Sequence, residues 1–515
     1  MQCVINTRRL CLLQQFLFCI LAVCPLLMIG CAGHIGKTRE ALSALDAGNA
    51  DKALELLNAA LEVDRADQIP TKMGHDTAVL ILDRSMVLMQ MQNYSLASRD
   101  LEVADKQIEL LDFARSTSHD IAKYMFSDDA GPYKAPPYEK LMINTMNMVA
   151  YLSRGDLQGA RVEARRLSVM QKYLASKEAS ELSLTRAGSY LAGFTFEKSG
   201  DSQQALRYYD EALQYGKYKS LSPVIRRLAQ HASYRTPGLS KIIGEEITTT
   251  PTTTPTTTPT TSTAEPVPLV FTDSPNEDNP TVAGAVFAEN PPPPTMSPEN
   301  TQATSHKPSE SGELLVVVSY GRVPAKYAER IPIGLAMQIA HSHVTPQQRA
   351  QANRLALIGM VTWINYPRMG SPRGRYTTPI VNVNARSTPL EGILSVDQES
   401  QKAWDEAKGA VVASAITRML TRAVAGGIAE GATKAGTDSG ILGVLAGLGT
   451  QAALAATDTP DTRCWATLPA RIAFSRVSLP PGKYTVAVDL NSVNHKQKIT
   501  LEPGGWSVVS VTSLR

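Results

Sequence analysis

The residues of this 515-residue chain that could do chemistry are few and scattered. The closest histidine pair is His341 and His343, and alternate residues of a strand share a face that could contribute two ligands to a metal. No third ligand lies nearby in the sequence, so we interpret the pair as surface residues. The paired acids Asp128 and Asp129 fall in a segment that we expect to be a solvated loop.

Sequence motifs of enzymes give no further candidate. The chain has no phosphate-binding P-loop, no dinucleotide-type glycine-rich turn after a strand, no G-x-S-x-G and no H-E-x-x-H. We therefore predict no catalytic residues, no cofactor and no metal site. A hydrolase of an uncharted kind stays open as an alternative, since the absence of motifs does not exclude catalysis.

The cysteines are placed very unevenly along the chain. Their positions are Cys3, Cys11, Cys19, Cys24, Cys31 and Cys464. If a leader is removed before Cys31, Cys464 is the one interior cysteine and has no internal partner for a disulfide. We expect Cys464 to be a small buried apolar residue, with a reactive thiol as the alternative. The net charge is +3, and two of those charges belong to Arg8 and Arg9, so we predict no nucleic-acid binding.

The first 33 residues have the anatomy of a secretory signal. Arg8 and Arg9 precede the apolar run "FLFCILAVCPLLMI" at 16–29, and small residues surround Cys31. The apolar run is short for a membrane span. A helix that stays uncleaved and anchors the chain is the alternative. Either way, we expect the rest of the chain outside the cytoplasm.

This segment resembles the precursors of bacterial lipoproteins, whose lipobox ends in a small residue followed by the acylated cysteine. Residues 28–31, "MIGC", fit that box, with methionine where leucine is more usual. The resemblance implies a signal peptide at 1–30 and lipid attachment, palmitate included, at Cys31. It also implies the outer membrane as the destination, because Ala32 and not aspartate follows the cysteine. We expect the periplasmic face.

Residues 38–235 have the periodicity of helices, and one frame recurs in them. Its turn positions are Gly48, Gln92, Gly155 and Gly200. Five residues after each turn comes a small residue, namely Ala53, Ala97, Ala160 and Ala205. A glycine turns the chain between two antiparallel helices without a Cβ penalty, and the alanine lets the second helix pack closely. The segment "MFSDDAGPYKAPPYEK" at 125–140 reads as an insert between repeats.

The frame resembles the tetratricopeptide repeat (TPR), and its best copy is 187–213. That copy carries Gly193, Phe196, Gly200, Ala205, Tyr209 and Ala212 at the signature positions, but has Ser189 in place of tryptophan. The turns are 44, 63 and 45 residues apart, against a repeat of about 34, so the copies are divergent. The resemblance implies an all-α helical repeat domain at 31–236.

By the same resemblance, a groove for protein partners would carry residues of the last repeat. These are Tyr190, Phe194, Glu197 and Lys198. We expect envelope proteins as the partners, bound on the concave surface that stacked hairpins form. The alternative is that Tyr190 and Phe194 simply pack against the neighbouring hairpin.

Composition changes after the helices. Residues 237–311 include "TTTPTTTPTTTPTT" and "ENPPPPTMSPEN", which predict a disordered Pro/Thr-rich linker that holds the next module at a distance. Residues 312–515 read as a β-rich domain, with strand candidates at 313–321, 377–385, 471–479, 484–492, 495–501 and 506–514. We expect the last four to form a small antiparallel sheet or a sandwich.

A helical insertion rich in alanine and glycine interrupts the β region at 400–457. Its segments at 407–436 and 439–457 predict a closely packed hairpin that covers one face of the sheet. The alternative is an element for self-association or membrane contact, since residues 439–457 carry no charge.

The whole arrangement resembles poorly characterised TPR lipoproteins of Gram-negative bacteria, in which residues 136–167 and 461–472 look like family signatures. We therefore expect a multidomain, lipid-anchored envelope scaffold that binds partners without catalysis. Two alternatives are an accessory factor of peptidoglycan synthesis, and an assembly or secretion component that oligomerises through 407–457.

Overall fold

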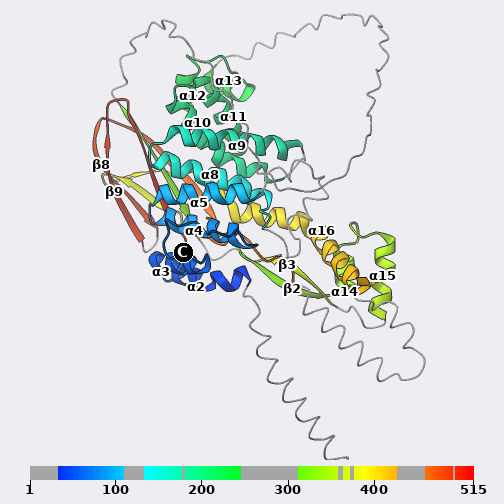
Figure 1. The fold of residues 1–515 in the computed structure, drawn as a ribbon. Helices are drawn as coiled ribbons and strands as arrows, with labels where there is room; N and C mark the ends of the chain where they lie inside the picture. Colours follow the sequence, from blue (N-terminus) through cyan, green and yellow to red (C-terminus); the bar gives the residue numbers. More distant parts are fainter. Residues whose placement is uncertain are drawn as a thin grey trace, which may run out of the picture. The chain divides into compact units, whose positions relative to one another are not determined.

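The computed structural model describes residues 33–108, 133–176, 180–244, 311–357, 363–371, 376–425, 459–490 and 493–515. Helices occupy the N-terminal half of the chain, and sheets occupy the C-terminal region (Figure 1). The N-terminal helices are α2 (His34–Asp46), α3 (Ala50–Ala60), α4 (Thr77–Gln90), α5 (Tyr94–Gln107), α8 (Pro137–Ser153), α9 (Leu157–Ser176), η1 (Ser180–Leu184), α10 (Thr185–Lys198), α11 (Ser202–Tyr215), α12 (Leu221–Leu228) and α13 (Pro237–Ile243).

The predicted turn positions end one helix and begin the next. The φ angles are 79° at Gly48, 60° at Gln92, 77° at Gly155 and 82° at Gly200. All four lie in the left-handed region that glycine adopts without strain, and Gln92 adopts it as well. The residue after each turn is Asn or Asp, and its side chain accepts a hydrogen bond from the backbone of the following helix, as a helix N-cap does.

The alanines of the frame are buried where each second helix meets its first. Ala53, Ala97, Ala160 and Ala205 are fully buried. The hairpins pair α2 with α3, α4 with α5, α8 with α9, and α10 with α11, and each packs on the next. The frame therefore predicted the hairpins correctly. The predicted insert at 125–140 extends too far at its C-terminal end, because residues 137–140 form the first turn of α8 and are buried. Asp128 and Asp129 of this insert lie outside the described residues.

The described strands make two four-stranded sheets and a two-stranded ribbon. They are β1 (Gly312–Tyr320), β2 (Lys326–Pro332), β3 (Trp363–Met369), β4 (Ile380–Val383), β5 (Arg386–Thr388), β6 (Glu391–Ser395), β7 (Arg471–Leu479), β8 (Gly482–Leu490), β9 (Val493–Leu501) and β10 (Trp506–Ser513). One four-stranded sheet has the order β10-β1-β7-β6 and the other β5-β4-β8-β9, while β2 and β3 form the ribbon.

The strand pairing corrects one sequence expectation. The last four strands do not form one antiparallel sheet, because β7 and β8 belong to different sheets although a short turn joins them. β10 runs parallel to β1, with Glu313 opposite Trp506. Of the two arrangements expected, the sandwich is the one observed, since Leu314, Val316 and Val318 of β1 pack with Val486 and Val488 of β8 in a core between the sheets.

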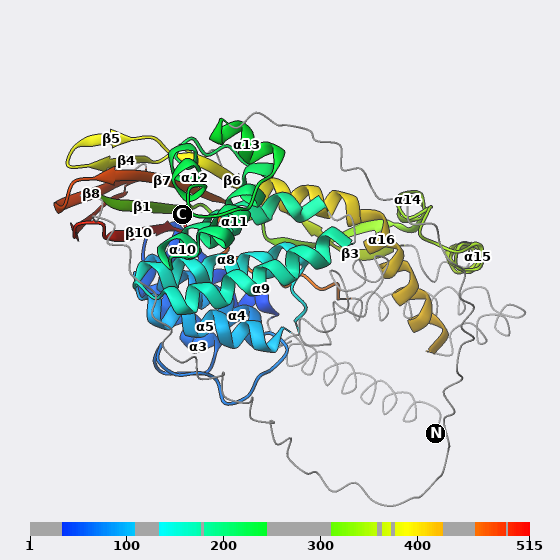
Figure 2. The same ribbon diagram turned by 90° about the horizontal axis from the view of Figure 1, so that it is seen from above.

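Strand β1 has two buried faces. Its even-numbered residues face the second sheet, whereas Leu315 and Val317 belong to the same hydrophobic core as the helices. A continuous apolar run such as "LLVVV" is typical of a strand that is covered on both sides. The helices therefore form one layer, and the two sheets form two more (Figure 2).

The helices and the β region share one compact unit, formed by 1–245 and 309–515. The expectation that a linker holds the β module away from the helices is therefore wrong, because the strands complete the helical core. The predicted linker also begins too early, because Pro237–Ile243 form helix α13, which packs on α12. Residues 245–310 of the predicted linker lie outside the described residues.

The predicted helical insertion is described only in its first part. Helix α16 (Val396–Ala425) runs for 30 residues. It packs on β3, on η1, and on the short helices α14 (Ile333–Ile339) and α15 (Pro346–Leu357). The described part of the insertion therefore packs mainly on the ribbon and its short helices, not on a four-stranded sheet as expected. Its second segment, 439–457, lies outside the described residues.

Candidate functional site

The four predicted groove residues lie on one face of α10. Phe194 follows Tyr190 by four residues, and Glu197 and Lys198 follow Phe194 by three and four, which places them side by side on a helix. Tyr190 and Phe194 are fully buried, and the side chain of Glu197 is 4% exposed. The structure brings all four together, as the sequence predicted.

The aromatic part of this face contacts the β strands of the same chain. The ring of Tyr190 stacks on Phe474 of β7 with centroids 4.5 Å apart, and on Tyr218 at 4.7 Å. The ring of Phe194 meets Trp506 of β10 edge to face at 5.8 Å. Such aromatic pairs add stability beyond the burial of their surface.

The charged part of the face is a buried network centred on Glu197. Arg476 of β7 donates from Nη2 to both carboxylate oxygens of Glu197, at 2.9 and 2.8 Å. Arg476 also bonds Glu313 of β1, which pairs in turn with Lys198. Tyr209 donates its hydroxyl proton to Glu197 at 2.6 Å. The network therefore joins two helices to two strands.

The ionisation of Glu197 follows from this network. Burial alone would raise its pKa, but the positive charges of Arg476 and Lys198, together with the Tyr209 hydrogen bond, outweigh burial and lower the pKa to about 2. Glu197 is therefore a carboxylate throughout the physiological pH range. Its partner Arg476 stays positively charged, because a buried carboxylate needs an opposite charge beside it.

This geometry corrects the interpretation of the face as an open groove. Strands β1, β7 and β10 cover the four side chains, so another protein cannot contact them without displacing the chain's own sheet. The alternative was packing on a neighbouring hairpin. Tyr209 and Tyr218 do contact Tyr190, but the main occupant is the β region.

The two segments singled out as family signatures meet at a second buried junction. Trp465 donates its backbone N–H to Oε1 of Glu139 at 3.1 Å, and its indole Nε1 donates to the carbonyl of Leu82 at 2.9 Å. Two residues on, Thr467 bonds Asp83, which also lies 2.8 Å from Nε2 of His34. This segment thus ties the β region to α2, α4 and α8.

The titratable groups of this junction are closed off from solvent. Burial raises the pKa of Glu139, against the opposing effects of Lys326 and of the Tyr133 and Trp465 hydrogen bonds. Burial also raises the pKa of the Cys464 thiol to about 12. Cys464 is a free, buried cysteine, as predicted, and a protonated thiol at this depth is not a nucleophile near neutral pH.

The histidine pair does not lie on a strand. His341 and His343 fall in the turn between α14 and α15. Among the described residues, no group of three or more His, Cys, Asp or Glu side chains is arranged to hold a metal ion. In the same part of the chain, no helix combines the length and the apolar character needed to cross a membrane.

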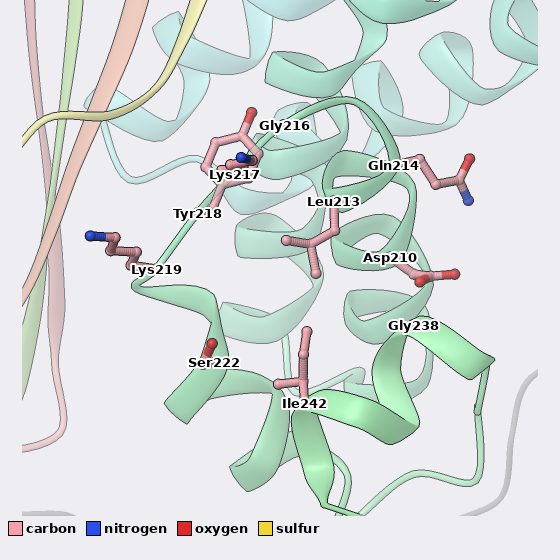
Figure 3. A pocket seen from close by; sticks show the side chains of 10 residues that line it. All are labelled: Asp210, Leu213, Gln214, Gly216, Lys217, Tyr218, Lys219, Ser222, Gly238 and Ile242. Carbon is pink, nitrogen blue, oxygen red and sulfur yellow. The ribbon is translucent and has the colours of Figure 1, made fainter. Parts of the chain in front are cut away.

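An accessible hollow lies at the end of the helical array, between α11 and the short helices α12 and α13. It has a volume of about 500 Å³. Its lining residues are Asp210, Leu213, Gln214, Gly216, Lys217, Tyr218, Lys219, Ser222, Gly238 and Ile242 (Figure 3). The sequence analysis missed this site. A detectable signal was the composition of residues 212–244, which include six Lys or Arg and no Asp or Glu.

Comparison of the chain with models of protein families, with curated proteins and with solved structures found no match. Cys31, the predicted lipid-attachment residue, lies outside the described residues.

Proposed function

We propose that this chain is a lipid-anchored scaffold of the bacterial outer membrane, facing the periplasm, whose TPR-like helical array binds envelope proteins. The observation that carries the proposal is the position of the first helix. Ala32 alone separates Cys31 from Gly33, and α2 begins at His34. His34 is buried and bonded to Asp83, so the packed body begins immediately after the candidate lipid site.

An acyl group on Cys31 would hold the array against the membrane surface with almost no intervening chain. Membrane affinity grows by roughly 0.8 kcal/mol per buried CH₂, so one chain binds reversibly and two or more hold firmly. Stacked hairpins then offer their remaining exposed surfaces to partners. In this proposal the β region stiffens the array, because it covers the face of α10 that carries Tyr190 and Phe194 and contributes Trp465 to the junction with α4 and α8.

The anchor is tested by fractionation of cells that make the full chain. A Cys31→Ser variant should move from the membrane fraction to the soluble fraction or accumulate as uncleaved precursor, and mass spectrometry of the wild type should find acyl chains on the new N-terminal cysteine. The matched control is Cys24→Ser, which changes a cysteine of the leader and should leave fractionation unchanged. A Cys31→Ser variant that stays with the membranes at full processing overturns the proposal.

A further inference from the structure

The last helices of the array form a basic cap, which we define as residues 216–244. Its six basic side chains are Lys217, Lys219, Arg226, Arg227, Arg235 and Lys241, all exposed. Three acids that contact the cap are already engaged: Glu197 with Arg227, Glu391 with the N-terminus of α12 at Ser220, and Asp210 with Tyr234 and Thr236. The cap is therefore a positive surface at one end of the described array.

The hollow described above opens on this cap. Leu213 of α11 and Ile242 of α13 point toward one another across it, and Tyr218 adds an aromatic wall (Figure 3). Asp210 at its edge accepts hydrogen bonds from Tyr234 at 3.2 Å and Thr236 at 3.0 Å, so its carboxylate is satisfied internally. A cavity of about 500 Å³ with apolar walls accommodates one or two large side chains of a ligand.

Two lysines stand at the rim of the hollow. Lys217 and Lys219 flank Tyr218, and neither has an acidic partner among the described residues. Unpaired cations beside an apolar depression complement a ligand that combines carboxylates with an apolar side chain. An apolar anchor in a pocket supplies affinity, and charges on the rim supply specificity and a faster association rate.

We propose that the basic cap binds an extended acidic peptide of a partner protein, with an apolar side chain in the hollow and carboxylates against Lys217 and Lys219. This inference rests on the proposed scaffold function and names the surface and the partner chemistry for it. A membrane is the less favoured occupant. The hairpins pack in chain order from α2 to α13, so the cap lies at the opposite end of the array from α2, the helix that follows the candidate lipid site in the sequence (Figure 1).

Site-specific photocrosslinking in cells tests the contact directly. A benzoylphenylalanine replaces Lys219 in the full chain, and crosslinked peptides are sequenced by mass spectrometry. We expect partner peptides rich in Asp and Glu with Leu, Ile or Phe among them. The same replacement at Lys483 on β8, which is also exposed, is the control and should not capture these peptides. Crosslinks from position 219 only to lipid, or only to segments without acidic residues, overturn the inference.

Charge reversal then tests the role of the lysines. A synthetic copy of the crosslinked peptide, labelled with a fluorophore, is titrated with the full mature chain in detergent micelles. The double variant Lys217→Glu/Lys219→Glu should weaken binding at least tenfold, and Ser222→Phe, which fills the hollow from its edge, should weaken it comparably. The control Lys496→Glu/Lys498→Glu makes the same charge change on exposed positions of β9 and should bind as the wild type does. Equal affinity for all variants overturns the inference.

The failure of this inference is distinguishable from the failure of the scaffold proposal. Val162 and Val169 are exposed on α9, away from the cap. If probes there capture envelope proteins while position 219 captures none, the scaffold stands and the basic cap is not its binding surface. If no probe on the array captures a protein, both proposals fail.

Discussion

Arg476 on β7 forms two hydrogen bonds from one guanidinium nitrogen to the carboxylate of Glu197 on α10, a residue 279 positions earlier in the chain. Both side chains are almost completely buried, at 2% and 4% exposed. The contact joins the helical array to the sheet at the face where an external partner was expected. It therefore makes the β region a structural part of the array.

Removal of Arg476 should destabilise the whole unit. An Arg476→Met variant leaves Glu197 buried with less compensation, and breaking a buried pair in this way costs about 3 kcal/mol or more. Urea unfolding at pH 7 measures the loss. The control Arg207→Met removes a partly exposed pair with Glu211 and should cost under about 1 kcal/mol. Similar losses of unfolding free energy in the two variants would show that the buried network does not contribute mainly to the stability of the unit.

The same network should make the protein sensitive to acid. The pKa of Glu197 falls from 4.5 to about 2 in the folded state, so its contribution to stability is fully present above about 4.5 and is lost as the pH falls toward 2. Melting temperatures between pH 6 and pH 2.5 should therefore drop more steeply for the wild type than for Glu197→Gln. Parallel curves of melting temperature against pH for the two proteins would contradict the lowered pKa of Glu197.

Glu163 on α9 should change the stability of the fold with pH in the direction opposite to Glu197. Burial raises its pKa to about 7, although Asn144 and Arg166 favour the charged form. A carboxyl group whose folded-state pKa is raised stabilises the fold most at low pH, and stability falls as the pH rises from about 4.5 through 7. Glu163→Gln should therefore stabilise the protein by about 1–3 kcal/mol at pH 8 and leave it unchanged at pH 4. The control Glu40→Gln alters an exposed carboxyl of α2 and should change neither value.

Cys464 should resist alkylation in the folded protein. Its thiol is buried, and its pKa is raised to about 12. In a Cys31→Ser chain made without residues 1–30, iodoacetamide at pH 8 should label Cys464 only after urea unfolds the protein. A Lys483→Cys variant supplies an exposed thiol that reports whether the reagent is active. Rapid labelling of Cys464 without urea would contradict the observed burial.

The sequence predicted the helical hairpins because their signals are local. A left-handed turn residue, an Asn or Asp cap and a small alanine fall within eight residues of one another, so one frame at Gly155 and Gly200 specifies the turn and the packing. Strand pairing depends on residues far apart, such as Glu313 with Trp506. Nothing local distinguishes that parallel pair from a pairing of neighbouring strands.

The candidate site was predictable only in part for the same reason. The helical periodicity of α10 correctly predicts that Tyr190, Phe194 and Glu197 share one face. It does not predict which part of the chain covers that face. One signal was overlooked. In "RIAFSRVSL", Ile472, Phe474 and Arg476 alternate, so a charge lies on the apolar face of a strand and requires a buried acid as its partner.

Two glycines of the last hairpin should respond differently to alanine. Gly200 has a φ of 82°, and no neighbouring atom lies within 4 Å of the position that an added methyl group would take. Gly200→Ala should therefore cost only the strain of the left-handed conformation, about 1 kcal/mol.

At Gly193 an added Cβ would overlap the ring of Tyr209, the residue whose hydroxyl bonds Glu197. Gly193→Ala must push that ring away and loosen the network, and we expect a loss of about 3 kcal/mol, in the range of severe overpacking. Thermal unfolding of the two variants side by side measures the difference. Equal losses would mean that close approach of α10 and α11 at Tyr209 does not constrain the position of the Arg476 network.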